Sequence, residues 1–132
     1  MGAKDEKSGA KPVELAKTGD AEGLKARLQA GGPADSSDRL GVTALAHAAR
    51  RGDLAAIELL LEHGADPDKT SDSGNSPLME AAARGHADVV KRLLAAGADP
   101  KRKNKWGFDA QNWADWPVNG AEIRALLEQN EG

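Results

Sequence analysis

Three histidines carry the side chains best suited to acid–base or metal chemistry near neutral pH: His47, His63 and His86. No His-Glu-x-x-His motif, nucleophile elbow or phosphate-binding loop accompanies them. Cysteine is absent, which excludes a thiolate metal site, a cysteine nucleophile and a disulfide. The sequence therefore predicts a protein that is not an enzyme, with no catalytic residues and no cofactor.

Four aspartates near glycine and proline residues suggest a different chemistry, that of a divalent cation site. They are Asp66, Asp68, Asp72 and Asp99. Aspartate at such turn positions ordinarily accepts hydrogen bonds from nearby backbone amides. We therefore expect these carboxylates to cap turns, and we predict no bound metal.

The aromatic residues gather near the C-terminus, where the three tryptophans and the single phenylalanine all lie between Trp106 and Trp116. Such rings can close the core of a terminal structural unit, because tryptophan is usually largely buried, or they can anchor a binding partner. Trp106 and Phe108 flank Gly107, which is expected at a loop tip, and this position predicts exposed anchors. Trp113 and Trp116 are predicted instead to fold over the core.

A basic run, Lys101-Arg102-Lys103-Asn104-Lys105, adjoins these rings. Its four cations are typical of a solvated loop tip. Beside Trp106 they could instead receive an acidic peptide, and Arg102 could stack on an indole. Over the whole chain 18 Lys and Arg stand against 21 Asp and Glu, a formal charge of −3, so the composition does not predict nucleic-acid binding.

No segment predicts export or membrane insertion. The charged start at residues 1–7 has no apolar run, which argues against a signal peptide. The most apolar window, Leu54 to Leu61, contains Glu58 and is far shorter than the ~20 apolar residues of a membrane span. The chain has 132 residues, 39% of them apolar, which is enough for one core. We expect one cytoplasmic domain that does not bind a membrane, with a disordered tail at residues 1–10.

Glycines divide the chain at a fixed period. Three series of glycines are evenly spaced, and all three have the same spacing, which is the distance in sequence from Gly19 to Gly52. The series are Gly19, Gly52 and Gly85; Gly31, Gly64 and Gly97; and Gly41, Gly74 and Gly107. Apolar residues keep the same period, as Leu60, Leu93 and Leu126 do. A shared period of this length indicates stacked structural repeats that bury one continuous core.

Each period contains the signals for two helices. The first helix begins after a residue whose side chain can cap the free amides of the first turn. These residues are Thr43, Ser76 and Asp109. The helix ends at Gly52 or Gly85, where glycine can adopt the left-handed conformation, and Asp53 or His86 is then expected to cap a second helix. In the last unit the first helix is predicted to be short.

The segments at 43–48 and 76–81 read Thr-Ala-Leu-Ala-His-Ala and Ser-Pro-Leu-Met-Glu-Ala. They resemble the Thr-Pro-Leu-His-x-Ala signature of the ankyrin repeat, whose period of about 33 residues matches the glycine interval. The resemblance covers about residues 11–129 and implies an all-α ankyrin-repeat solenoid, with four stacked helix-turn-helix units, hairpin-like loop tips and divergent terminal caps. We expect a single domain at residues 11–130, with repeats at about 11–37, 38–70, 71–103 and 104–130.

The resemblance also implies where a partner binds, because ankyrin repeats usually bind through a concave groove formed by the loop tips and the exposed sides of the first helices. The predicted protein-binding residues are Arg39, Leu40, Val42, His47, Arg50, Asp72, Ser73, Asn75, Met79, Glu80, Lys103, Lys105, Trp106, Phe108, Asn112 and Trp113.

The predicted function is that of a non-enzymatic protein–protein interaction module, a regulator or inhibitor of one partner. The aromatic residues and the basic run predict a partner that offers an acidic or apolar patch. We expect the chain itself to be a monomer. An alternative of another class is a small-ligand or anion-binding protein that uses the basic loop tip at residues 101–105.

Overall fold

The computed structural model describes residues 10–129, so the tail predicted at residues 1–10 lies almost wholly outside the described residues. Within them the chain forms eight helices and no strand. The helices are α2 (Pro12–Thr18), α3 (Ala21–Gln29), α4 (Ala44–Arg51), α5 (Leu54–Glu62), α6 (Pro77–Arg84), α7 (Ala87–Ala95), α8 (Ala110–Trp113) and α9 (Gly120–Gln129). None of these helices has the length and apolar character that a membrane span requires.

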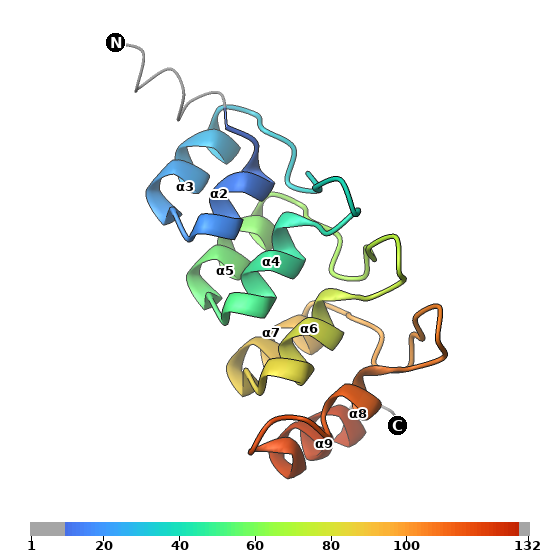
Figure 1. The fold of residues 1–132 in the computed structure, drawn as a ribbon. Coiled ribbons are helices and arrows are strands. Elements are labelled where there is room, and N and C mark those ends of the chain that lie inside the picture. Colours follow the sequence, from blue (N-terminus) through green and yellow to red (C-terminus); the bar gives the residue numbers. More distant parts are fainter. Residues whose placement is uncertain (1–9, 130–132) are drawn as a thin grey trace.

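The helices lie in two layers that run the length of the molecule (Figure 1). Helices α2, α4, α6 and α8 form an inner layer, and α3, α5, α7 and α9 form an outer layer. Each inner helix contacts the outer helix that follows it, and the first three also contact the inner helix of the next pair. The predicted all-α solenoid of four stacked helix-turn-helix units is therefore confirmed, as is the short first helix of the last unit.

The capping residues predicted for the inner helices are confirmed. Thr43, Ser76 and Asp109 directly precede α4, α6 and α8. The side-chain oxygen of each accepts a hydrogen bond from the backbone amide three residues later, at 3.1 to 3.2 Å. Helices α4 and α6 end at Gly52 and Gly85, which have φ of 71° and 74°. These bonds and turns satisfy backbone groups that helix ends leave unpaired, which is why the helices begin and end where the sequence predicts.

His86 lies at the N-cap position of α7, as predicted, but it does not cap the helix with its side chain. Asp53 does cap α5, since its carboxylate accepts the amide of Ala56 at 3.1 Å. His86 stands at the corresponding position before α7, but its side chain makes no capping hydrogen bond. Its Nε2 instead lies 3.1 Å from the carbonyl oxygen of Arg50 in the preceding unit. The imidazole is longer than a carboxylate and reaches the neighbouring inner helix, so it joins two units.

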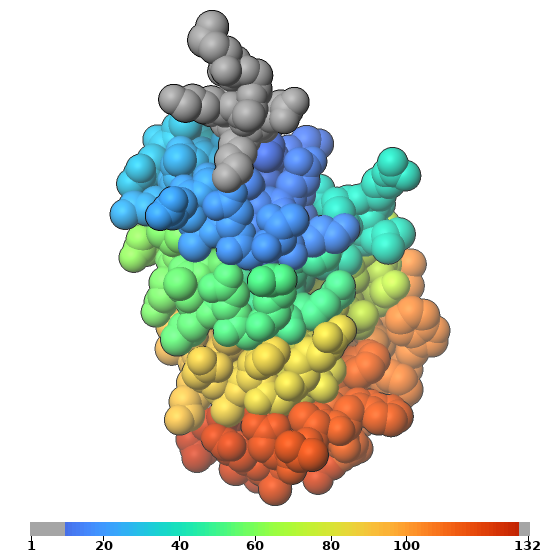
Figure 2. All heavy atoms as spheres, turned by 60° about the vertical axis from the view of Figure 1, so that its left-hand side comes forward, coloured from blue at the N-terminus to red at the C-terminus, as the bar shows by residue number. Residues whose placement is uncertain are grey.

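One apolar core connects all four helix pairs. Figure 2 shows the pairs as successive layers packed directly on one another. Fully buried large side chains come from every pair; they include Leu24, Leu45, Ile57, Leu60, Leu78, Leu93, Ile123 and Leu127. A single helix pair cannot cover such a face, so the stacking of units supplies the burial that stabilises each one.

Candidate functional site

Three hairpins project from the same side of the molecule, just before the inner helices (Figure 1). They occupy residues 38–42, 71–75 and 104–108. The first residues of the three hairpins are Asp38, Ser71 and Asn104. The side-chain oxygen of each accepts a hydrogen bond from the backbone amide four residues later, at 3.0 to 3.3 Å. Each turns at a glycine with positive φ, namely Gly41, Gly74 and Gly107. The repeat period thus builds three hairpins of the same form.

Backbone hydrogen bonds join the hairpins into a row. The amide of Asp72 donates to the carbonyl oxygen of Leu40 at 2.9 Å, and the amide of Lys105 donates to that of Ser73 at 3.0 Å. These two bonds are one repeat apart and have the same form. We call the row, together with the exposed side of α4, α6 and α8, the hairpin face.

The half of the hairpin face near the N-terminus is charged. Nε2 of His47 lies 2.8 Å from Oδ2 of Asp38, and the other oxygen of Asp38 accepts the amides of Leu40 and Val42. Partial burial by itself raises the pKa of the Asp38 carboxyl, but the hydrogen bonds from His47 and from the two amides outweigh it and lower the pKa below its usual value. Asp38 therefore stays ionised while it holds the first hairpin on α4.

The next unit adds an ion pair that crosses from α4 to α6. Nη2 and Nε of Arg50 donate to the two carboxylate oxygens of Glu80 at 2.9 and 3.3 Å. The hydrogen bond with Glu80 raises the pKa of Arg50 and outweighs the cost of partial burial. Both side chains are only partly buried, so the pair keeps some polar surface exposed to solvent.

We expect the contribution of Asp38 to stability to depend on pH. Its folded pKa lies below the unfolded value of about 3.9, so the stabilisation is present above about pH 4 and is lost as the pH falls through the folded pKa. Asp38→Asn keeps the turn, because Asn104 makes the same amide contacts in the third hairpin. It should lower the free energy of unfolding at pH 6 by about 1 kcal/mol, and by progressively less below pH 4. Urea unfolding at both pH values measures the difference; an equal loss at pH 6 and pH 3 would contradict the role of the charge.

The half near the C-terminus is aromatic. Trp106 is 64% exposed and Phe108 is 46% exposed on the third hairpin, which confirms the predicted exposure of both rings. Phe108 meets Trp113 edge to face, with ring centroids 6.1 Å apart. A cleft of about 300 Å³ opens beside them, and Asn112, Asp115 and Trp116 complete its lining. The rings therefore form both a protruding edge and a shallow cleft.

Of the two remaining tryptophans, one is placed as predicted and the other is not. Trp113 is half-buried and packs against the core, as predicted. Trp116 is 76% exposed, so the prediction that it folds over the core is wrong. The reason is the length of α8, which ends at Trp113. The chain has left the helix before it reaches Trp116, whereas in α6 the corresponding Ala83 is still helical.

Three of the predicted binding residues are buried, so the prediction that they contact a partner directly is wrong. Val42, His47 and Met79 are buried, so they support the hairpin face from beneath and are not available for direct contact. His47 turns its ring to Asp38, and Met79 lies in the capped first turn of α6. The other predicted residues are exposed or partly exposed on or beside the hairpins and inner helices: Arg39, Leu40, Arg50, Asp72, Ser73, Asn75, Glu80, Lys103, Lys105, Trp106, Phe108, Asn112 and Trp113.

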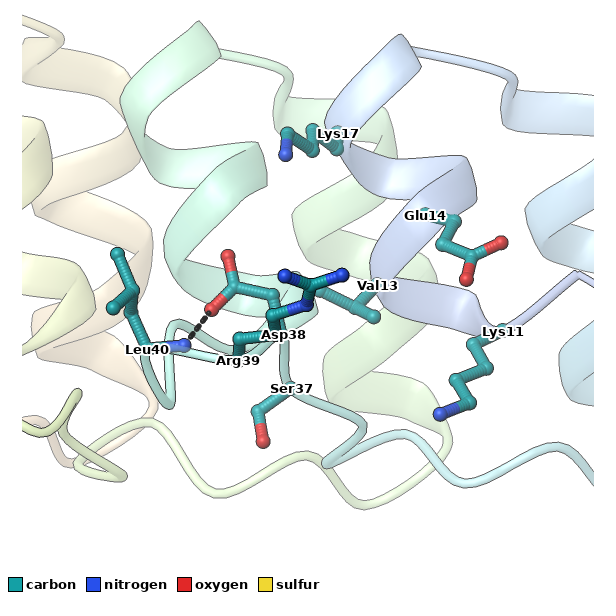
Figure 3. A pocket seen from close by; sticks show the side chains of 8 residues that line it. All are labelled: Lys11, Val13, Glu14, Lys17, Ser37, Asp38, Arg39 and Leu40. Carbon is teal, nitrogen blue, oxygen red and sulfur yellow. Dashed lines mark hydrogen bonds between the residues drawn. The ribbon is translucent and has the colours of Figure 1, made fainter.

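A pocket of about 770 Å³ that the sequence did not predict lies between α2 and the first hairpin (Figure 3). Its lining residues are Lys11, Val13, Glu14, Lys17, Ser37, Asp38, Arg39 and Leu40, of which only Arg39 and Leu40 were predicted as binding residues. The repeat register could have found two of the others. Glu14 and Lys17 precede His47 and Arg50 by one repeat period, so they take the corresponding positions on α2.

Capping of backbone amides was expected for all four turn aspartates, and three of them show it. Asp66 accepts the amide of Asp68, Asp68 accepts that of Asp99 in the next unit, and Asp99 accepts that of Lys101, each at 2.9 Å. Within residues 10–129 no group of three or more potential metal-ligating side chains comes together. Asp66 and Asp99 therefore stabilise their own turns, whereas Asp68 connects two successive loops.

A comparison with protein families agrees with this geometry. The family model described as ankyrin repeats, in three copies, matches residues 13–104. The matched region begins in α2 and ends at the start of the third hairpin, so α8 and α9 follow it. No curated protein matches the sequence.

Proposed function

The chain belongs to the ankyrin repeat family, whose members are generally protein–protein interaction modules, and we propose that it is a non-enzymatic module that binds one protein partner through the hairpin face and so regulates or inhibits that partner. The family is typically not enzymatic.

The observation that carries the proposal is the exposure of large apolar side chains on the hairpin tips. Leu40 is 69% exposed on the first hairpin, and Trp106 and Phe108 are exposed on the third. Trp106 and Phe108 lie close together on one tip, and adjacent exposed apolar side chains of this kind mark contact sites. Tryptophan is also enriched among residues that dominate binding energy. The aromatic half of the hairpin face therefore best supports the role of anchor.

The charges around the anchor indicate what the partner offers. Lys101, Arg102, Lys103 and Lys105 are all exposed beside Trp106. An apolar patch flanked by acidic side chains would complement this end of the hairpin face. The cations lie on the outside of the loop, where solvent screens them, so the geometry supports them as the rim of a protein interface more than as a separate anion site.

We further propose that the domain extends over residues 11–130 as a monomer, with α8 and α9 as its C-terminal cap. The fourth pair packs on the third as the other pairs pack on each other, since α8 contacts α6 and α9 contacts α7. The core residues Ile123 and Leu127 are fully buried.

Trp106→Ala is expected to weaken partner binding by about 30-fold, or about 2 kcal/mol, because it removes the larger and more exposed of the two rings on the third hairpin. The intact chain is first used as bait in lysate of the source cell. A protein that it captures is then purified, and its Kd is measured by calorimetry with the intact chain and the variant.

Val118→Ala is the matched control. Val118 is a fully exposed apolar residue in the loop between α8 and α9, away from the hairpins. It should leave the Kd unchanged within twofold. If Trp106→Ala also leaves the Kd unchanged, the aromatic half is not the anchor and the proposal fails at this site.

A further inference from the structure

The first hairpin has an open edge. In the second and third hairpins the amides of Asp72 and Lys105 donate to a carbonyl of the preceding hairpin. The corresponding amide of the first hairpin belongs to Arg39, one period before Asp72. Among residues 10–129 it has no acceptor. The row of hairpins therefore ends in an unpaired backbone donor, the feature that lets an extended chain add to a sheet edge.

The pocket beside α2 lies along this open edge. Figure 3 shows the amino groups of Lys11 and Lys17 and the guanidinium of Arg39 around it, with the carboxylate of Glu14 pointing away from Arg39. The other acid of the lining, Asp38, is already held by His47 and by two backbone amides. The charges free to meet a ligand are thus mainly positive.

We propose that this pocket binds an extended, acidic segment of a partner protein, whose backbone carbonyl accepts the Arg39 amide and whose carboxylates pair with Lys11, Lys17 and Arg39. Side chains alternate along an extended chain, so residues between the carboxylates would face Leu40, the apolar side chain at the hairpin tip. The inference rests on the proposed function, because it assumes a protein ligand, but it concerns the opposite end of the hairpin face.

The open backbone donor and the larger space favour this end over the other. At the far end of the row the corresponding open group is the carbonyl of Trp106, an acceptor, and the adjoining cleft of about 300 Å³ is mainly aromatic. The pocket beside α2 is about 770 Å³ and has three cations at its lining. An acidic strand that offers carbonyl oxygens therefore fits the pocket beside α2.

The probe is a capped hexapeptide that alternates glutamate and valine, titrated into the isotope-labelled full chain and followed by NMR. We expect saturable shifts at Lys11, Lys17 and Arg39, and slower hydrogen exchange of the Arg39 amide. Lys17→Glu with Arg39→Glu should weaken binding by about tenfold. The matched control, Lys25→Glu with Lys91→Glu, makes the same charge change at exposed sites on α3 and α7 and should weaken it less than twofold.

Four outcomes would overturn the inference: shifts confined to residues 101–108, equal affinity for a lysine–valine peptide, equal weakening by the two double variants, or an Arg39 amide that is already protected in the free chain. The last would mean that the edge is occupied without a ligand. Trp106→Ala should leave the affinity for the peptide unchanged. Its effect on the partner and the binding of the peptide therefore test the two proposals separately.

Discussion

Replacing Leu78 by alanine is expected to lower the free energy of unfolding by about 3 kcal/mol. Leu78 is fully buried in α6, which contacts α4 on one side, α8 on the other, and α7 in its own unit. The substitution leaves a cavity that these helices can fill only in part. Because each unit is stabilised by its neighbours, the loss weakens the interfaces on both sides of α6.

Urea-induced unfolding followed by far-ultraviolet circular dichroism measures this loss. Leu40→Ala is the matched control, because it makes the same chemical change at an exposed hairpin tip and should alter the free energy by less than about 0.5 kcal/mol. Equal unfolding midpoints for the two variants would show that Leu78 does not support the core.

Gly52→Ala is the second change with a large expected effect, a loss of about 3 kcal/mol. Gly52 ends α4 with φ of 71°, a conformation that alanine adopts only with strain. A Cβ atom there would also lie 2.6 Å from Nδ1 of His86. The imidazole would have to move, and its hydrogen bond to the carbonyl of Arg50 would be lost. This glycine thus both ends a helix and makes room for the next unit.

Gly64→Ala separates the cost of backbone strain from the cost of the contact with His86. Gly64 has φ of 87°, but nothing lies within 4 Å of the Cβ position. It should therefore show the backbone strain alone, about 1 kcal/mol. With His86 replaced by alanine, the substitutions at Gly52 and Gly64 should cost the same, as judged by thermal and urea unfolding. Equal losses in the original chain would contradict the contact between Gly52 and His86.

The sequence by itself determined the repeat, the helix ends and the hairpin turns. A cap such as Thr43 acts on an amide only three residues away, and a glycine such as Gly41 acts on its own backbone. The interactions that decide these features are local, so each signal in the sequence has its full effect within one helix or turn. The exposure of Trp106 and Phe108 was predicted from their place beside Gly107, at the tip of the last hairpin, where nothing lies within 4 Å of the Cβ position of the glycine.

Contacts between units were decided only by the tertiary structure. Trp116 lies exposed because α8 stops early, and His86 reaches Arg50 because of the distance between neighbouring helices. His47 and Met79 are buried beneath the hairpins, although the register alone placed them on the inner helices. The pocket beside α2 exists because the first hairpin stands opposite a helix from the preceding unit. These features depend on where a helix ends and on how side chains pack between neighbouring elements. A repeat pattern shows which residues are equivalent, but it does not show which of them the rest of the fold covers.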